Sequence, residues 1–406
     1  MMWNGWSIRK TGVPCERPDG TTGGTGAAPD GTTGGTGAAP EGKAGASPDG
    51  TPPRVAKLRQ ILKERGGEAL LVTSAVNRRY ITGFTGTAGV VVITTEHAAL
   101  FTDFRYREQA AQQARGFEVI EHGLDQKADV GEWLRRRDVR RVLFEDYDVS
   151  FAEHRAWSEK LTPAELQPAG RLVERLRMIK DEAELAILRE AADIADRAFQ
   201  HVLPKIKPGV TEREIALELE WFMRSQGAAS SSFDTIVASG ERSSLPHGVA
   251  SERVIGSGDF VTLDFGAYYK GYCSDLTRTV VVGKPTDRQR EIYDIVLEAQ
   301  LTALERLGPG MTGREADALT RDVIKRYRYD EYFGHGTGHG IGMEIHEAPR
   351  LSRTDETVLL PGMTVTVEPG IYLPGFGGVR IEDDVVITDT GIQILTRSPK
   401  ELIALD

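Results

Sequence analysis

Cysteine is scarce in this 406-residue chain, and long apolar runs are missing. The two cysteines, Cys15 and Cys273, have no spacing typical of a disulfide framework or a cysteine zinc site, and they fit a reducing compartment. No apolar run approaches the ~18 residues that a membrane helix needs. The first twenty residues contain no hydrophobic stretch typical of a signal peptide. We therefore expect a cytoplasmic protein without a membrane partner.

An excess of positive charge is also missing. Fifty Lys and Arg residues stand against 60 Asp and Glu, which leaves a formal charge of -10. This balance argues against a broadly basic surface for nucleic acid or anionic lipid, and it suits carboxylates gathered around cations. Apolar residues make up 40% of the chain, enough for two or three domains with cores of their own.

The composition divides the chain into three regions. In residues 17–53, rich in Gly, Pro, Thr, Ala and Asp, the unit PDGTTGGTGAA occurs in tandem from Pro18 and Pro29. Such a segment buries too little apolar area to fold, so we expect residues 1–53 to be a disordered tail; a tether has no residue-level support. Residues 54–172 alternate apolar strand candidates such as EALLVTS and AGVVVITTE with helical stretches, which predicts an α/β domain. Residues 171–203 then predict a long amphipathic helix that opens a third region, 173–406.

The third region contains an internal repeat. Residues 208–214 read PGVTERE and residues 309–315 read PGMTGRE, and in each a threonine precedes a glutamate by three positions. This is the capping-box arrangement of a helix start. Helices flank both copies and strand-like segments follow them, which predicts a duplicated ααββ unit whose helices back a largely antiparallel sheet. A chance match is the alternative, because Pro-Gly before a capped helix is common.

Two pairs of acidic residues lie symmetrically about predicted turns. Asp264 and Asp275 are equidistant from a turn near residues 269–271, so in a simple hairpin they face each other with Cβ atoms ~5 Å apart. Glu368 and Glu382 are placed in the same way about Gly375. A surface-exposed pair would need no cation. Four carboxylates on one sheet face, however, carry about −4, which two divalent ions can neutralise and one cannot. The pattern therefore predicts a dinuclear metal site.

Four of the eight histidines lie in two glycine- or proline-rich segments. HGTGHGIGMEIHE contains His335, His339 and His346, and LPHG contains His247. A single histidine is more often structural, but four beside two acidic hairpins favour a catalytic cleft. GTGHGIG lacks the strand before it and the helix after it that a dinucleotide-binding loop needs. No HExxH motif and no nucleophile elbow occur, so a nucleophilic side chain is disfavoured.

With these residues in place, residues 54–406 resemble the pita-bread metallopeptidase family, which includes aminopeptidase P, prolidase, methionine aminopeptidase and the metal-free creatinases. The family has an Asp, a second Asp eleven residues later, a His in a GHGIG-like segment and two Glu residues as ligands of two metals. The resemblance assigns these roles to Asp264, Asp275, His339, Glu368 and Glu382. It also implies a creatinase-like α/β N-terminal domain before an α+β pita-bread catalytic domain with pseudo-twofold ααββ repeats. NRRYITGFTGTAGV and FTDFRYREQA are the segments similar to that N-terminal domain.

The resemblance implies an Xaa-Pro peptidase, because Arg380 resembles an arginine of the proline-specific branch. We expect an aminopeptidase P-like enzyme acting on proline-containing peptides, with an Xaa-Pro dipeptidase (prolidase) as the alternative. A non-catalytic binding module would lack a ligand, and all five are present. Oxygen-rich coordination with one imidazole favours Mn(II), with Co(II) or Zn(II) as alternatives. Relatives also suggest a homodimer.

The remaining roles also rest on the resemblance. Glu368 would carry a proton from water to the leaving nitrogen, while His247 and His346 would hold the substrate carbonyl. His335 and Tyr372 would line the substrate pocket, although a core role suits Tyr372 equally well. Arg380 would steady an acidic ligand or meet the peptide beyond proline. Thr277 is expected to form a hydrogen bond with Asp275. The N-terminal domain is expected to cover the cleft.

Overall fold

The computed structural model describes residues 52–406. The tail expected over residues 1–53, with its repeat and Cys15, lies outside the described residues except for its last two. The second of these, Pro53, begins a helix, since proline suits the first helical position, where its missing N–H leaves no hydrogen bond unmade.

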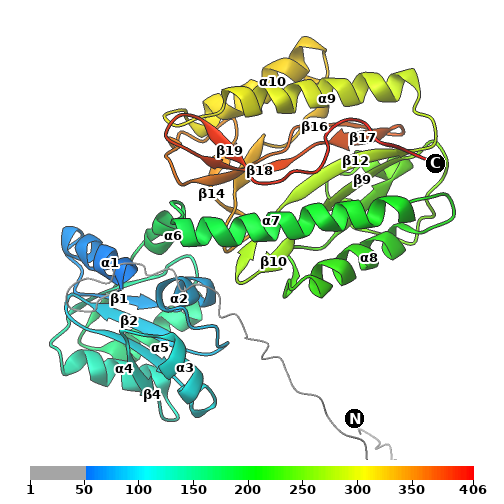
Figure 1. The fold of residues 1–406 in the computed structure, drawn as a ribbon. Helices are drawn as coiled ribbons and strands as arrows, with labels where there is room; N and C mark the ends of the chain where they lie inside the picture. Colours follow the sequence, from blue (N-terminus) through cyan, green and yellow to red (C-terminus); the bar gives the residue numbers. More distant parts are fainter. Residues whose placement is uncertain (1–51) are drawn as a thin grey trace, which may run out of the picture. The chain divides into compact units, whose positions relative to one another are not determined.

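A six-stranded mixed sheet forms the N-terminal region, in the order β4-β3-β2-β1-β5-β6 (Figure 1). Every residue of β1, β2 and β3 is buried, which explains apolar runs that do not alternate. The strands are β1 (Ala69–Val72), β2 (Val90–Thr94), β3 (Ala98–Thr102), β4 (Glu118–Glu121), β5 (Arg141–Phe144) and β6 (Glu165–Pro168). The helices are α1 (Pro53–Glu64), α2 (Ala75–Thr82), η1 (Phe104–Tyr106), α3 (Arg107–Gln113), α4 (Gln126–Arg135) and α5 (Phe151–Leu161). The expected α/β fold of this region is confirmed.

The long amphipathic helix expected within residues 171–203 is present, but it does not extend over the whole stretch. The chain forms a short helix α6 (Leu172–Arg177) and a long helix α7 (Glu182–Val202), separated by residues 178–181. Asp181 accepts a hydrogen bond from the backbone N–H of Glu184, whose side chain accepts from the backbone N–H of Asp181. This capping box starts a new helix where the apolar periodicity alone indicated continuity. The domain boundary near residue 172 stays a prediction.

The repeat predicted from PGVTERE and PGMTGRE is present in the fold. Thr211 and Thr312 each form a capping box with the glutamate three residues later, and they begin α8 (Glu212–Ser225) and α10 (Gly313–Arg326). The preceding helices are α7 and α9 (Asp287–Arg306). Both threonines also make an isolated antiparallel bridge, to Val254 and Val358 respectively. The two copies thus share helices, caps and bridges, which confirms the duplicated fold.

Two larger sheets and two small ones carry the strands of this region. One sheet has the order β20-β12-β9-β8, another β14-β13-β15-β18-β19, and the small ones are β11-β10-β7 and β16-β17. All their ladders are antiparallel except that between β12 and β20. The first strands are β7 (Ser230–Ser231), β8 (Ile236–Ser239), β9 (Phe260–Phe265), β10 (Ala267–Tyr269), β11 (Tyr272–Cys273) and β12 (Leu276–Val282). The later ones are β13 (Gly338–Gly340), β14 (Glu347–Leu351), β15 (Thr364–Val367), β16 (Gly370–Leu373), β17 (Gly377–Arg380), β18 (Asp383–Ile387), β19 (Ile392–Ile394) and β20 (Ala404–Leu405). Short helices η2 (Leu203–Lys205), η3 (Gly240–Ser244) and η4 (Asp330–Tyr332) complete the region.

Each helix pair covers these strands with an apolar face. Ile194 and Ala198 of α7 pack with Leu219 of α8 against strand residues such as Val261 and Leu263. In the second copy, Ile292 of α9 belongs to a cluster with residues of β16 and β17. Figure 1 shows the α7–α8 pair along one side of the strands and the α9–α10 pair along the other. The helices therefore shield the sheets, and the site is formed by residues of the strands and of their connections.

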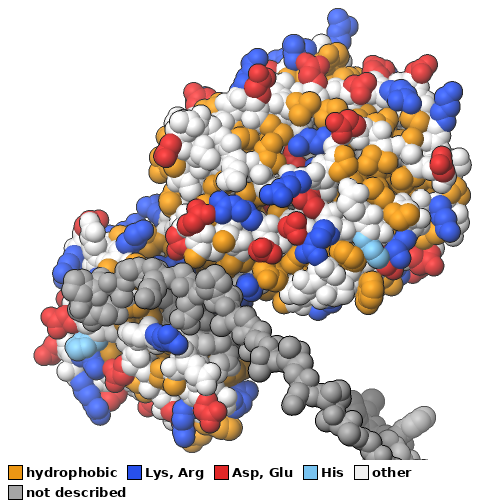
Figure 2. All heavy atoms as spheres, in the orientation of Figure 1, with side chains coloured by type: hydrophobic (Ala, Val, Ile, Leu, Met, Phe, Trp, Pro, Cys, Tyr) orange, Lys and Arg blue, Asp and Glu red, His pale blue; other side chains and the backbone are white. Residues whose placement is uncertain are grey.

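The surface mixes charges of both signs. On the face shown in Figure 2, Lys and Arg side chains are interspersed with Asp and Glu and do not gather in one field. Among the helices of residues 52–406, none is both long and apolar enough to cross a bilayer.

Candidate active site

A cavity of about 760 Å³ opens between the two halves of the repeat. It collects side chains from strands, turns and loops that are far apart in the sequence. The predicted site residues that line it are His247, Asp264, Asp275, His335, His339, His346, Glu368, Arg380 and Glu382. Tyr372 and Thr277 do not line it, and their positions are described below.

The first acidic hairpin has a different register from the one expected. Its turn is Lys270–Gly271, and both residues have positive φ values of 49° and 93°, as a type I′ turn requires. This turn pairs Asp264 with Thr277 and leaves Asp275 two residues away, between β11 and β12. Asp264 and Asp275 are therefore diagonal neighbours, and the expectation that they lie directly opposite each other is wrong.

The second acidic hairpin has the register that its symmetry about Gly375 predicts. Gly370 pairs with Arg380 in the β16–β17 ladder, and Val367 pairs with Asp383 in the β15–β18 ladder. Glu368 and Glu382 lie between these two ladders, at positions that correspond across the hairpin. Gly375 has a φ of 75° at the tip, a conformation that favours glycine.

His339 enters the cavity from the middle of β13, where glycines flank it. A Cβ atom at Gly338 would lie 2.0 Å from the carbonyl oxygen of Thr366, and one at Gly340 would lie 2.3 Å from that of Ala348. Only glycine permits this close approach of β13 to both neighbouring segments. His339 Nδ1 lies 3.1 Å from the carbonyl oxygen of Gly340, and Nε2 lies 3.7 Å from Asp275 and 3.4 Å from Glu368. The ring therefore presents Nε2 to the carboxylates.

The arrangement of the carboxylates fits divalent cations. One ligand atom each from Asp275, His339 and Glu382 lies within 4.8 Å of the others. Asp264 Oδ1, Asp275 Oδ1 and Glu382 Oε1 are buried without any hydrogen-bond partner. Leaving buried charged oxygens unpaired is costly, so these atoms are in place to coordinate a cation. Carboxylate oxygens with one imidazole are a ligand set that hard divalent metals prefer.

Two of these carboxylates have a second oxygen held by the protein. Arg380 Nη2 donates to Asp264 Oδ2 at 2.5 Å, and Thr277 Oγ1 donates to Glu382 Oε2 at 2.5 Å. Thr277 thus orients Glu382 and not Asp275, and the expectation for Thr277 is wrong. Arg380 Nε also donates to Thr277 Oγ1 at 3.1 Å, which ties the two supports together. Such neighbours fix how a ligand meets its metal.

Burial and crowding shift the protonation of the cluster. Burial, together with the charges of Glu382 and Asp264, raises the pKa of Asp275 well above its usual range. Burial raises the pKa of Glu368 to about 7, and burial with the neighbouring carboxylates raises the pKa of Glu382 strongly. Burial lowers the pKa of His339 to about 3. Each pKa shift favours the neutral form of the group, because a buried charge without a compensating partner is costly. Cations bound in the cluster would lower the pKa values of the carboxylates again.

Tyr372 lies behind the cavity wall, so its expected place as a lining residue is not what the structure shows. Arg380 Nη1 donates to the Tyr372 hydroxyl at 2.8 Å, and His335 Nε2 lies 2.8 Å from the same oxygen. The carbonyl oxygen of Gly336, 2.8 Å from His335 Nδ1, can only accept, so Nδ1 carries the proton of the neutral ring. Nε2 then accepts from the Tyr372 hydroxyl. Tyr372 thus orients His335, whose pKa burial lowers to about 4.

His346 and His247 line the open side of the cavity. The His346 ring meets the His339 ring edge to face, with centroids 4.4 Å apart. Its side chain makes no hydrogen bond within residues 52–406, and its accessible position suits contact with a substrate. The catalytic roles of both histidines stay predictions.

Arg350 lines the cavity and was not predicted from the sequence. It lies directly opposite His339 in the β13–β14 register. Within residues 52–406 its guanidinium has no ion pair and no hydrogen-bond partner, although it lines the cavity. Its position four residues after His346, on a strand leaving the same segment, was the available signal. Phe233, Ile236, Val249 and Ile345 add apolar wall that the sequence did not reveal.

Comparisons with known proteins agree with this geometry. Residues 186–389 match metallopeptidase family M24, and residues 54–179 match the creatinase/prolidase N-terminal domain. An Xaa-Pro dipeptidase structure from Bacillus anthracis is 56% identical with a TM-score of 0.85, over 87% of this chain and 99% of that one. An Xaa-Pro dipeptidase of Pyrococcus furiosus is 41% identical over 86% of this chain and 99% of its own. An X-Pro aminopeptidase structure from Thermotoga maritima is 40% identical with a TM-score of 0.81, over 84% and 99% of the two chains.

Proposed function

The chain belongs to metallopeptidase family M24, and from this premise we propose that it is an Xaa-Pro dipeptidase. This replaces the aminopeptidase P-like enzyme expected first from the sequence with the alternative expected beside it. Relatives named Xaa-Pro dipeptidase, at 56% and 41% identity, support the proposal. The X-Pro aminopeptidase of Thermotoga maritima, at 40% identity, keeps that activity as the second candidate.

The unpartnered guanidinium of Arg350 is the observation that supports a dipeptide substrate. In an Xaa-Pro dipeptide the carboxylate is attached to the proline itself, close to the bond that breaks. A longer peptide has an amide at that place and carries its carboxylate further away. The positively charged Arg350 side chain, on the cavity wall beside His339, therefore favours the shorter substrate, because a guanidinium and a carboxylate form strong charge-assisted hydrogen bonds.

The residues that would hold two divalent cations are Asp264, Asp275, His339, Glu368 and Glu382. Bound there, such cations would polarise a carbonyl group and bring the pKa of water towards neutrality. Mn(II), with Co(II) or Zn(II) as alternatives, stays a prediction, as do a homodimer and a cytoplasmic location.

Glu368 is the proposed proton carrier. The Xaa-Pro bond is a tertiary amide without an N–H, so the prolyl nitrogen must receive a proton as the bond breaks. Glu368 lies on the cavity wall, with Oε1 held at 3.2 Å by the Thr366 hydroxyl and Oε2 4.0 Å from His335 Nδ1. We assign His346 and His247 to the substrate carbonyl, His335 to the side of the proline ring, and Arg380 to the support of Asp264.

Paired substrates test the proposal. The Mn-loaded protein is given Ala-Pro, Ala-Pro-amide and Ala-Pro-Ala, each with a chelator control, and the products are separated. We expect cleavage of Ala-Pro alone, abolished by the chelator. In Arg350→Ala, kcat/KM for Ala-Pro should fall by ~10- to 100-fold, which corresponds to the free energy that a hydrogen bond to a charged group contributes. Equal cleavage of the tripeptide would favour the aminopeptidase, and full activity of Arg350→Ala on Ala-Pro would remove the argument for dipeptides.

A further inference from the structure

A chain of buried polar contacts runs from the N-terminal sheet to the segment that carries His346. It begins at Glu145, which follows β5, and passes through Asn77 on α2 to Arg177 at the end of α6. It ends at Glu347, the residue directly after His346. No part of this network touches the predicted metal ligands, and the proposed reaction does not use it.

Arg177 is the centre of the network. Its side chain is 2% exposed. Nη1 donates to Asn77 Oδ1 at 2.8 Å, while Nη2 donates to Glu344 Oε2 at 2.8 Å and also to Glu347 Oε1. Lys180, 1% exposed, supports the other oxygen of Glu347 from 3.3 Å. One guanidinium thus joins a helix of the N-terminal region to both ends of residues 344–347.

The N-terminal end of the network is equally well held. Asn77 is fully buried and donates to Glu145 Oε1 at 2.6 Å and to Glu174 Oε1 at 2.8 Å. Glu145 Oε2 in turn accepts from the backbone N–H groups of residues 73 and 74 at 2.7 Å each. Because each buried carboxylate and amide has its partners, the network resists small displacements.

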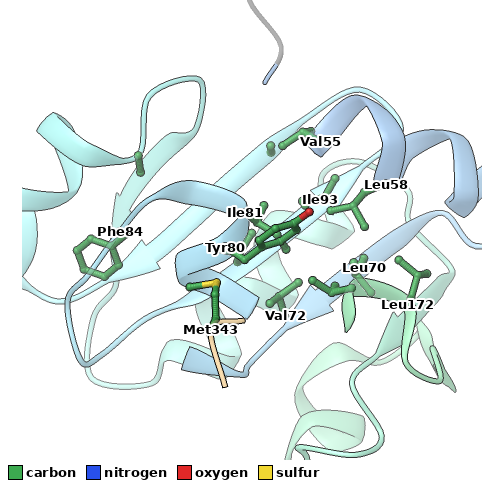
Figure 3. Close-up of a cluster of buried hydrophobic side chains, with 14 of the residues drawn as sticks. Val55, Leu58, Leu70, Val72, Tyr80, Ile81, Phe84, Ile93, Leu172 and Met343 are labelled. Carbon is green, nitrogen blue, oxygen red and sulfur yellow. The ribbon is translucent and has the colours of Figure 1, made fainter. Parts of the chain in front are cut away.

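An apolar contact holds the same segment from the same side. Met343 is 6% exposed and belongs to a hydrophobic cluster that joins residues of the N-terminal region, such as Tyr80, to residues of the following region, such as Leu188. Figure 3 shows its side chain beside Tyr80 and Val72. The backbone just before Met343 also packs closely on Glu347, since a Cβ atom at Gly342 would lie 2.7 Å from Glu347 Oε2. The anchors at 343 and 347 therefore fix the backbone of the three residues between them.

His346 needs this external support because its own side chain has little. Its ring contacts the His339 ring and makes no hydrogen bond within residues 52–406. Where the ring lies in the cavity is therefore decided by the backbone of residues 345–347. Displacing a reacting group by about 1 Å can cost on the order of 10²-fold in rate.

We propose that Arg177 is a positioning residue for His346, and that through Arg177 and Met343 the N-terminal region sets the geometry of the cleft. The N-terminal region would then be part of the catalytic apparatus and more than a cover. The proposal rests on the proposed function only in giving His346 a role in the reaction.

Arg177→Met tests it by removing the charge while keeping much of the apolar stem. In the Mn-loaded full chain we expect kcat on Ala-Pro to fall on the order of 10²-fold, with KM and metal content little changed. Hydrogen exchange of the amides at residues 342–347 should become faster. Arg253→Met is the matched control, because Arg253 pairs with Asp259 at 2.6 Å and touches neither His346 nor its segment. Glu347→Gln is the second variant if Arg177→Met does not fold.

A double-mutant cycle with His346→Ala separates positioning from general stability. If Arg177 acts through His346, Arg177→Met should cause little further loss of kcat once His346 is Ala. Arg177→Lys, which keeps the positive charge but lacks the several N–H donors of the guanidinium, should retain part of the activity that Arg177→Met loses. A fully additive loss, or unchanged exchange at residues 342–347, would overturn the proposal. If the wild type does not cleave Ala-Pro, but Arg177→Met still exchanges the amides at residues 342–347 faster than the wild type, the result would count against the Xaa-Pro function alone.

Discussion

Replacing Thr277 by valine should weaken metal binding without disturbing the fold. The Thr277 hydroxyl donates to Glu382 Oε2 at 2.5 Å and accepts from Arg380 Nε at 3.1 Å. The side chain is fully buried in β12, and valine keeps its branched shape. The substitution thus leaves one oxygen of a predicted ligand and one guanidinium N–H without a partner.

The size of the effect follows from those two contacts. A hydrogen bond to a charged group contributes ~1.5–3 kcal/mol, and 1.4 kcal/mol is tenfold in an equilibrium constant. Loss of a residue that supports a metal ligand lowers affinity by about 10- to 100-fold. We therefore expect the dissociation constant of the more weakly bound of the two Mn(II) ions to rise by ~10- to 100-fold. Calorimetric titration of the metal-free protein would measure it.

Thr279→Val supplies the control. Thr279 is two residues along the same strand, buried, and its hydroxyl donates to the carbonyl oxygen of Arg380 at 3.1 Å. The same hydroxyl accepts from the backbone N–H of Arg380 at 3.2 Å and lies 3.1 Å from the Thr262 hydroxyl, so Thr279→Val also removes buried hydrogen bonds, but none of them reaches a predicted ligand. If Thr277→Val binds Mn(II) as tightly as the wild type, or if Thr279→Val weakens binding equally, the assignment of Thr277 to the support of Glu382 is refuted.

Two further predictions concern the metal cluster. Asp264→Asn should lose bound metal and peptidase activity while circular dichroism shows the fold retained; near-normal activity would contradict the ligand assignment. Metal-free protein should lose thermal stability as pH rises from about 7.5 to about 8.5. In this range His339, with its pKa lowered to about 3, is neutral in the folded and in the unfolded state, whereas Glu368, with its pKa raised to about 7, and Glu382, with its pKa raised well above its usual range, still bind a proton more tightly when folded than when unfolded. Mn(II) should abolish this slope, and a metal-free protein equally stable at both ends of this range would argue against the buried carboxylate cluster.

Local signals in the sequence predicted their structures well. The Thr211 and Thr312 caps depend on residues three positions apart, and both form as expected. The same signature at Asp181 and Glu184 was available, yet the apolar periodicity on both sides concealed the helix break there. Symmetry about Gly375 gave the correct register of the second hairpin, since that turn has its tip at the centre of the segment.

Longer-range relations were harder to predict. The first hairpin differs by two residues because Lys270 adopts a positive φ, which moves the turn away from the symmetric centre. The partner of Thr277 is Glu382, 105 residues away, and nothing near either residue indicates this pair. Arg350 faces His339 only because β13 and β14 pair, which a single sequence does not reveal. The ligand types were thus predictable, and the contacts that orient them were not.

The placement of one acidic hairpin in each half of the repeat has a consequence for synthesis of the protein. During translation, Asp264 and Asp275 emerge well before Glu368 and Glu382, so a nascent chain presents only half of the predicted ligands. A ligand that binds only the native state stabilises it by mass action and gives nothing to a partly made chain. Metal can therefore stabilise the product only after the second hairpin has been translated and packed against the first. A chain truncated between the two hairpins would gain no thermal protection from Mn(II), so metal-dependent stability would distinguish finished molecules from incomplete ones.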